Sequence, residues 1–112
     1  MVVPEYNHGY PGEWKMVIDQ DGNNYIGKPV ITAGVSRGPF MGARVTEHIR
    51  PILTRLGFVS IHAPLYFGNV EDFVAADQTM RDEQYKGRII KSLDTLLQFE
   101  KRLHGINDIL TQ

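Results

Sequence analysis

The chain has 112 residues, of which 42% are hydrophobic, with a formal net charge of -1 and no cysteine. This length suits one compact domain and is too short for two. The near-neutral charge argues against nucleic acid or anionic lipid as a partner, because such binding needs clustered Lys and Arg. The lack of cysteine excludes disulfides, a thiolate nucleophile and Cys-based metal sites. No apolar run approaches the ~20 residues that span a bilayer, so we expect a cytoplasmic protein without membrane contact.

Strand and helix patterns alternate through the sequence, which predicts a parallel sheet. Residues 1–3 form a short apolar stub before Pro4, typical of the last residues of a strand. Three apolar residues at positions i, i+3 and i+4 predict a short helix over residues 12–19. A turn is expected at residues 21–24, and the mostly apolar run 29–35 predicts a central strand covered on both faces.

The middle of the chain predicts a helix followed by a third strand. Apolar residues recur at helical spacing over residues 45–56, and Gly57 suits a C-terminal cap. Pro51 lies inside this helix, where it removes a backbone donor, so we expect a kink or a break there. Residues 58–63 alternate in character and stop at Pro64, which predicts the third strand.

A long final helix is predicted to begin near Asp82, because one stripe of apolar residues continues from there at helical spacing. The stripe consists of Tyr85, Ile89, Leu93, Leu96, Leu97 and Leu103. Residues 65–81 are expected to form a long connection rich in aromatic residues, which either cover the sheet or line a subunit contact. These patterns predict an α/β fold with about three strands and three helices.

The loops that follow the predicted strands are the candidate sites, because ligands of open parallel sheets bind outside the carboxyl ends of the strands. The first loop offers Glu5, Tyr6, Asn7 and His8 in a row, just before a predicted helix. A planar ligand with a polar edge would suit this turn. The alternative is that Asn7 only makes the turn and Tyr6 is half-buried packing.

Two other kinds of site find little support. The four histidines lack metal-ligand spacing, so we expect no metal site. Ser36, His48 and Asp72 could be drawn as a catalytic triad, but no nucleophile-elbow sequence accompanies them. We therefore do not expect hydrolytic chemistry.

Several ordered blocks of sequence carry a resemblance to a known family. The blocks are Pro-Glu-Tyr-Asn-His-Gly-Tyr-Pro-Gly at residues 4–12, Gly-Lys-Pro-Val at 27–30 and Gly-Ala-Arg at 42–44, with Glu47, His48 and Arg50 after them. Together they resemble the NADPH-dependent FMN reductase family, a flavodoxin-like group that includes chromate, azo and quinone reductases. The resemblance runs from residue 2 to about residue 100, and it implies a flavodoxin-like three-layer parallel sheet.

The resemblance also implies a cofactor site. In such proteins the FMN ring lies against a turn that corresponds here to Pro4, Glu5, Tyr6 and Asn7. The loop corresponding to Ser36, Arg37 and Gly38 faces the pyrimidine side of the ring. The same loop could form an anion-binding nest with Arg37 and Arg44, but the family's phosphate site lies elsewhere, which favours a flavin-edge or structural role.

The activity implied by the resemblance is two-electron reduction by NADPH or NADH through FMN, with a quinone, a flavin, a metal oxyanion or a similar small molecule as electron acceptor. The flavin performs the hydride transfer and the protein positions it, so no catalytic acid or base is assigned. Relatives commonly dimerise, so we expect a homo-oligomer.

The chain departs from the family at its beginning. Relatives start with a further strand, helix, strand and helix, whose Ser- and Arg-containing loop grips the FMN phosphate. We therefore interpret residues 1–104 as the C-terminal portion of a flavodoxin-like domain, incomplete as given, and residues 105–112 as a C-terminal tail. Without three charge-assisted hydrogen bonds of ~1.5–3 kcal/mol each, FMN affinity should fall by about 5–9 kcal/mol. In a strand order of 2-1-3-4-5, the first strand here becomes an exposed edge that invites pairing with another chain.

Two rival interpretations remain at this stage. The chain could be a noncatalytic remnant or interaction module with the same partial fold, or Met1 could be a misplaced start of a longer protein. A working enzyme should hold FMN or oxidise NADPH when FMN is added. An interaction module should do neither, yet form a stable complex through its exposed edge.

Overall fold

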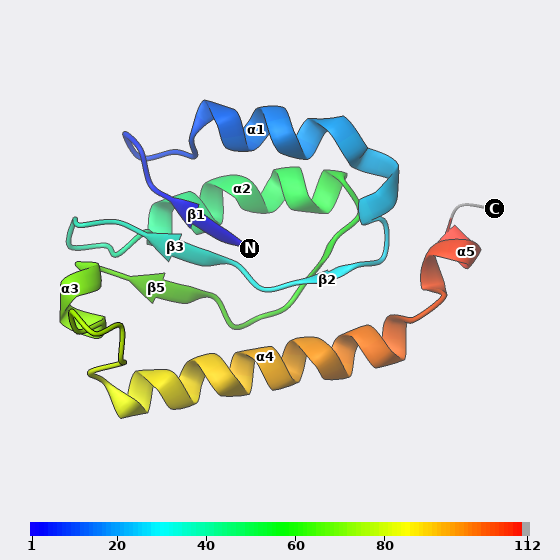
Figure 1. The fold of residues 1–112 in the computed structure, drawn as a ribbon. Coiled ribbons are helices and arrows are strands. Elements are labelled where there is room, and N and C mark those ends of the chain that lie inside the picture. The colour runs from blue at the N-terminus through cyan, green and yellow to red at the C-terminus, as the bar shows by residue number, and fades with distance from the viewer. Residues whose placement is uncertain (111–112) are drawn as a thin grey trace.

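The computed structural model describes residues 1–110 and shows parallel strands between two helical layers (Figure 1). Helices α1 (Gly12–Ile18) and α2 (Ala43–Arg55) lie on one side of the strands. Helix α4 (Glu83–Leu103) lies on the other side. The predicted α/β class with a three-layer parallel arrangement is therefore confirmed.

The main sheet has three strands in the order β1-β3-β5. Strand β1 (Val2–Pro4) pairs in parallel with β3 (Ala33–Val35), and β3 pairs in parallel with β5 (Leu65–Phe67). Strands β2 (Pro29–Val30) and β4 (Val59–Ser60) form a second parallel pair. Within residues 1–110, β1 has one strand neighbour, so its other edge is open, as expected.

The single central strand predicted over residues 29–35 is wrong in detail, because the structure divides it into β2 and β3. The division falls where the run changes neighbours, from β4 beside β2 to β5 beside β3. The backbone at the division stays bonded: the Ile31 carbonyl accepts from the terminal amine of Met1 at 2.9 Å, and the Thr32 carbonyl accepts from the Leu65 amide at 2.9 Å.

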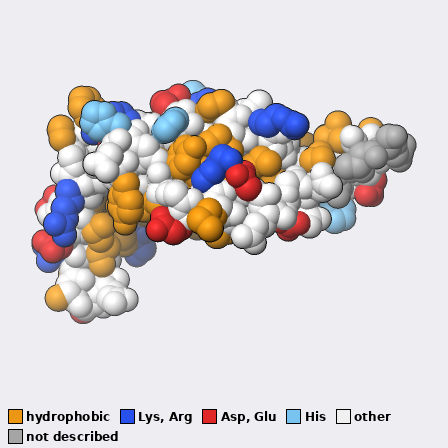
Figure 2. All heavy atoms as spheres, turned by 90° about the horizontal axis from the view of Figure 1, so that it is seen from above, with side chains coloured by type: hydrophobic (Ala, Val, Ile, Leu, Met, Phe, Trp, Pro, Cys, Tyr) orange, Lys and Arg blue, Asp and Glu red, His pale blue; other side chains and the backbone are white. Residues whose placement is uncertain are grey.

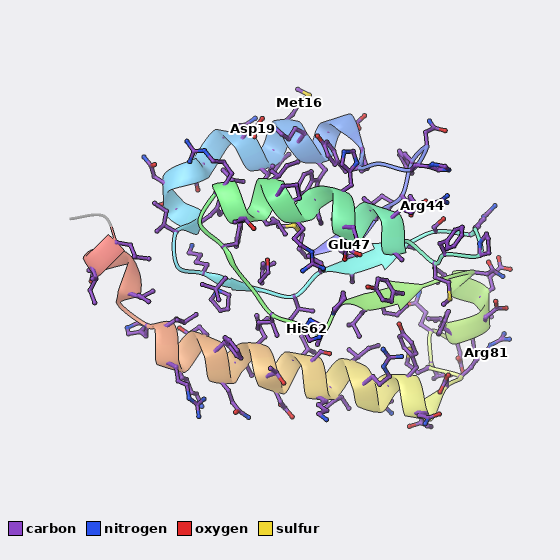
Figure 3. All side chains as sticks on the ribbon, turned by 180° about the vertical axis from the view of Figure 1, so that it is seen from behind. Met16, Asp19, Arg44, Glu47, His62 and Arg81 are labelled. Carbon is purple, nitrogen blue, oxygen red and sulfur yellow. The ribbon has the colours of Figure 1, made fainter. Side chains whose placement is uncertain are left out.

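The third strand, predicted over residues 58–63, is also wrong in its extent. Regular pairing covers β4 alone, and a bulge follows it that contains His62 (Figure 3). The Ile61 amide bonds to the Val30 carbonyl, and the Leu65 amide bonds to the Thr32 carbonyl. Between these two bonds the chain advances four residues, from 61 to 65, while the neighbouring segment advances two, from 30 to 32, which is the excess that defines a bulge. Pro64, which has no amide hydrogen, ends the bulge, and β5 begins where only a connection was predicted.

Helix α2 follows its sequence pattern and continues through Pro51, so of the predicted kink or break the break is wrong. The side chain of Pro51 is exposed, which lets water satisfy the backbone carbonyl that a proline leaves without its donor. Gly57 caps the helix as predicted, with a φ of +83°. The Gly57 amide bonds to the Thr54 carbonyl and the Phe58 amide to the Leu53 carbonyl, the two bonds of a Schellman motif.

Helix α4 begins at the predicted place, because the Asp82 carboxylate accepts a hydrogen bond from the Tyr85 amide at 2.9 Å and caps the helix. Three short helical segments were not predicted: η1 (Asp19–Tyr25), α3 (Val70–Phe73) and α5 (Ile106–Leu110). Helix α5 lies in the predicted tail, of which residues 111 and 112 are outside the described part.

The hydrophobic core lies between the strands and α2. Its buried members are Val3, Ile18, Val30, Val45, Ile49 and Leu53. The predicted stripe of α4 is only partly covered: Tyr85 is buried, whereas Leu93 and Leu97 are 54% and 58% exposed. The face of the molecule on the α1 side, opposite α4, shows hydrophobic side chains among charged ones (Figure 2). Met16 and Val17 of α1 are exposed. Within residues 1–110, no helix is long and apolar enough to cross a bilayer.

Candidate flavin-binding site

The chain turns sharply directly after β1. The amide of Tyr6 bonds to the Gly9 carbonyl and the amide of Gly9 to the Tyr6 carbonyl, each at 2.9 Å. Asn7 and His8 lie between them with φ angles of +50° and +70°. Two consecutive positive φ angles define a type I′ geometry, which Asn accepts better than most residues do. The turn presents the side chains of Tyr6, Asn7 and His8 to solvent.

The four predicted residues of this turn have different surroundings. Pro4 is the last residue of β1 and lies opposite Val35 of β3. The Tyr6 side chain is exposed, so the alternative of half-buried packing does not hold for it. Among the described residues, the side-chain amide of Asn7 has no hydrogen-bond partner, so it is free to form hydrogen bonds with a ligand. The carboxylate of Glu5 is the exception, because it turns inward toward α2.

Glu5 forms an ion pair with Arg44 at the start of α2 (Figure 3). The Nε and Nη2 atoms of Arg44 lie 2.7 Å from Oε1 of Glu5, and Nη1 lies 2.9 Å from Nε2 of His8. The Glu5 side chain is 3% exposed and that of Arg44 is 36% exposed. Glu5 therefore takes part in the turn through a buried charge pair rather than as a free acid.

The loop after β3 covers residues 36–42 and lies beside the turn after β1. Its backbone continues the sheet, because the Ser36 amide bonds to the Phe67 carbonyl at 2.9 Å. The Ser36 hydroxyl accepts a hydrogen bond from the Gly38 amide at 3.2 Å, which rigidifies the tip of the loop. Arg37 is exposed next to this tip.

The close approach of β3 and α2 fixes the base of this loop. A Cβ atom on Gly34 would lie 2.1 Å from the Gly42 carbonyl oxygen, and one on Gly42 would lie 2.4 Å from the Gly34 carbonyl carbon. Gly42 also has a φ of +80°, which favours glycine. Both positions therefore need glycine so that α2 can start against the sheet.

The parallel pairing brings the predicted residues of both loops to one end of the sheet. Pro4 and Val35 are register partners, and the Glu5 amide bonds to the Val35 carbonyl at 2.8 Å, so the two chains leave the sheet together. Arg44 then joins them, since its guanidinium also lies 4.8 Å from the centre of the Phe40 ring in the second loop.

The geometry weakens the alternative in which the Ser36–Gly42 loop binds an anion. The carboxylate of Glu5 neutralises Arg44, and the Gly38 amide already donates to the Ser36 hydroxyl. A phosphate would have to compete with both interactions. Among residues 1–110, no group of three or more His, Asp or Glu side chains is placed to hold a metal ion.

The sequence named His8 in the first loop and Arg44 in the anion-nest alternative, but it did not predict that the two side chains contact each other. One signal for Arg44 was available, because a cation in the first turn of a helix faces the positive end of the helix dipole. Such a residue needs an anionic partner, and Glu5 provides it. The identity of that partner, 39 positions away in the chain, could not be read from spacing.

The residues present fit the polar edge and the flat face of a flavin ring. The exposed Tyr6 ring offers an aromatic surface, and the free Asn7 amide offers a donor and an acceptor beside it. The Ser36–Gly38 tip lies at the end of the neighbouring strand. The fit concerns the ring, since the Glu5 carboxylate neutralises Arg44 and leaves no cationic nest for a phosphate there.

Comparisons with known proteins agree with this geometry. A family model described as NADPH-dependent FMN reductase matches residues 1–72. Quinone reductases of Escherichia coli K12 and of Shigella flexneri are each 36% identical over 74 residues, which cover 62% of this chain and 39% of the relative. This chain thus spans about two fifths of the length of these curated relatives.

A solved structure gives the same result for the fold. The flavoenzyme FerB, an NAD(P)H:(acceptor) oxidoreductase from Paracoccus denitrificans, superposes with a TM-score of 0.77 at 28% identity. The superposition covers 90% of this chain and 59% of that structure. The flavodoxin-like interpretation is confirmed by this neighbour, and the matched segment of the family model contains both loops of the candidate site. The chain therefore belongs to the NADPH-dependent FMN reductase family.

Proposed function

We propose that the chain contributes the ring-binding part of an FMN site, in a protein that transfers two electrons from NADPH or NADH through FMN to a small acceptor. The observation that supports this most is the convergence of the Tyr6–Gly9 turn and the Ser36–Gly38 tip at the carboxyl ends of β1 and β3. This edge is where open parallel sheets bind their ligands.

The proposed roles of the residues follow from their surroundings. Asn7 and the backbone of Pro4, Glu5 and Tyr6 address the edge and face of the ring. Ser36, Arg37 and Gly38 face the pyrimidine side. FMN, when bound, supplies the hydride-accepting ring, while the protein orients it and limits access of water. No side chain of this chain is proposed to act as an acid or a base.

The electron acceptor is proposed from the relatives' names. The curated relatives are quinone reductases, and the solved neighbour is an NAD(P)H:(acceptor) oxidoreductase. We propose a quinone, a free flavin or a similar flat acceptor that can replace the nicotinamide at the open ring face. We also propose that the protein works in the cytoplasm and acts as a homo-oligomer, the latter because Val2 at the open edge and Leu93 on α4 are exposed apolar residues.

The rival proposal is a noncatalytic module with the same partial fold. One observation favours it: the candidate anion nest is neutralised by the Glu5–Arg44 pair. Such a chain should bind FMN weakly, because the phosphate supplies much of the charge-assisted bonding available to the cofactor.

The test is a titration of the purified 112-residue chain with FMN, followed by flavin fluorescence, with the particle mass measured on the same sample. Micromolar binding together with NADPH oxidation would support the enzyme, and a mass above 12.7 kDa would support the oligomer. No binding at millimolar FMN would contradict the proposal that this chain by itself holds the flavin ring. A parallel titration with riboflavin, which lacks the phosphate, measures the ring contribution alone.

A further inference from the structure

Arg44 contacts both residues that flank the exposed pair Tyr6–Asn7. Its guanidinium bonds to the Glu5 carboxylate on one side and lies 2.9 Å from the His8 ring nitrogen on the other. Three of its nitrogens thus contact the residues before and after the Tyr6–Asn7 pair. Figure 3 shows Arg44 at the end of α2 that lies near the loops, whereas Glu47 lies further along the helix.

Loss of the contact between Arg44 and Glu5 would be energetically unfavourable. The Glu5 side chain is 3% exposed, and within residues 1–110 its Oε2 atom is buried without a hydrogen-bond partner. Both bonds to the carboxylate therefore come from Arg44, through Oε1. Removing Arg44 would leave a buried carboxylate uncompensated, which is far less favourable than losing an exposed pair.

The turn itself needs such support. Asn7 and His8 both have positive φ angles, and neither is glycine. Backbone conformations of this kind persist where surrounding contacts hold them in place. The reciprocal Tyr6–Gly9 bonds close the turn. Two sets of contacts hold it against α2: the His48 ring lies close to Gly9 and to the Tyr10 ring, and Arg44 bonds to Glu5 and His8. The bonds of Arg44 are the ones made on both sides of Tyr6 and Asn7.

We propose that Arg44 is a positioning residue that fixes the Tyr6–Gly9 turn relative to α2 and to the Ser36–Gly42 loop, so that the Asn7 amide is held ready for a flavin ring. The second loop is included because the Arg44 guanidinium also lies over the Phe40 ring. This inference rests on the proposed flavin site for its purpose. Its structural part, the fixing of the turn, is independent of any ligand.

The test compares Arg44→Ala and Arg44→Lys with Arg50→Ala in the full chain. Arg50 is a matched control, because it lies on the same helix and pairs with Glu47 at 2.5 Å, with both side chains largely exposed. The ligand-free readouts are the three-bond HN–Hα couplings of Asn7 and His8, which report φ, and hydrogen exchange of the Tyr6 and Gly9 amides. The ligand readout is FMN or riboflavin affinity by fluorescence.

In Arg44→Ala we expect exchange of the Tyr6 and Gly9 amides to quicken by about tenfold or more, and ring affinity to fall by about 10- to 100-fold. Arg44→Lys should fall between Arg44→Ala and the unmodified chain, because lysine keeps the charge but lacks the planar fork. Arg50→Ala should match the unmodified chain in both readouts. Unchanged couplings and exchange in a folded Arg44→Ala chain would overturn the proposal.

A second variant covers the case in which Arg44→Ala fails to fold. In Glu5→Gln/Arg44→Ala the buried charge is absent, so the fold should be recovered while the turn stays loose. A recovered chain with an ordered turn would overturn the proposal. If the unmodified chain binds no flavin, the proposed function fails, and the couplings of Asn7 and His8 still decide whether Arg44 orders the turn.

Discussion

The carboxyl end of β1 and β3 and the outer surface of α4 are built in opposite ways. At the first, two glycines bring backbones into contact, and a buried ion pair joins residues 39 positions apart. At the second, Leu93 and Leu97 of the apolar stripe remain exposed, and a tyrosine hydroxyl connects the helix to β5. The first region is ordered before any ligand arrives. The second retains apolar surface that a further protein segment can cover.

The largest expected effect breaks the ordered region at its base. In Gly34→Ala the new methyl group would lie 2.1 Å from the Gly42 carbonyl oxygen, so β3 and α2 must move apart. We expect the free energy of unfolding to fall by about 3–5 kcal/mol. Urea denaturation followed by circular dichroism measures this change. A loss below about 1 kcal/mol would mean that the two backbones are not in contact.

The matched change in the other region should have the opposite sign. Gly87 lies in α4, and a Cβ atom there would meet nothing within 4 Å outside its own helix backbone. Gly87→Ala should therefore raise the free energy of unfolding by about 0.5–1 kcal/mol through helix propensity alone. If both alanine variants destabilised equally, the contrast between the two regions would be lost.

The next effect concerns ligand binding at the ordered end. Asn7→Ala removes an exposed side-chain amide that has no hydrogen-bond partner within residues 1–110, but it also places alanine at a φ of +50°, so the free energy of unfolding should fall by about 1 kcal/mol. Flavin binding should weaken by about 1–3 kcal/mol, the range for a lost hydrogen bond at a site that excludes water.

Fluorescence titration with FMN measures the Asn7 effect, and Asn23→Ala serves as its control, because Asn23 is also exposed and lies in η1. An affinity unchanged by Asn7→Ala would remove this residue from the proposed site. An affinity lowered equally by both substitutions would point to a nonspecific effect.

A smaller effect tests how α4 is attached. The Tyr85 hydroxyl donates to the Tyr66 carbonyl, and the Tyr66 amide donates to the same hydroxyl at 3.0 Å. Tyr85→Phe leaves both backbone groups of Tyr66 without this partner, so the free energy of unfolding should fall by about 1–2 kcal/mol. Tyr25→Phe is the control, since the Tyr25 ring stacks on Phe58 at 4.8 Å and makes no hydrogen bond through its hydroxyl within residues 1–110. Equal losses would show that the hydroxyl of Tyr85 does not attach α4.

Helices were predictable because their signals are local. The spacing of apolar residues predicted α2 and α4 to within a few residues, and the Asp82 cap and the Gly57 stop lie where expected. The break at Pro51 was wrong because the consequence of a proline depends on whether its side of the helix is exposed. That exposure is a property of the packed molecule, not of the spacing.

Strands were harder to predict because pairing is set by distant neighbours. Residues 29–35 form one apolar run in the sequence, yet they divide where the adjacent segment bulges before Pro64. The candidate site shows the same contrast. The residues of the first turn were predicted from their identities and from the family resemblance, whereas the pairing of Glu5 with Arg44 depends on how closely α2 approaches β1.

The smallest effect contrasts the exposed Arg50–Glu47 pair with the Arg44–Glu5 pair, in which an arginine of the same helix bonds to a buried carboxylate. Hydrogen bonds from Arg50 hold the pKa of the Glu47 carboxyl below its ordinary value of about 4.5. A lowered pKa in the folded state means that the stabilisation is present above pH 4.5 and is lost as the pH falls through the folded value. Because the side chains of Glu47 and Arg50 are 62% and 46% exposed, Arg50→Ala should cost only about 0.3–0.5 kcal/mol near pH 7 and nothing once Glu47 is protonated. Urea denaturation of both chains from pH 3 to 7, with the Glu47 carboxyl followed by NMR, measures this difference. A cost that persisted where NMR shows the Glu47 carboxyl to be protonated would show that Arg50 acts through packing rather than through charge.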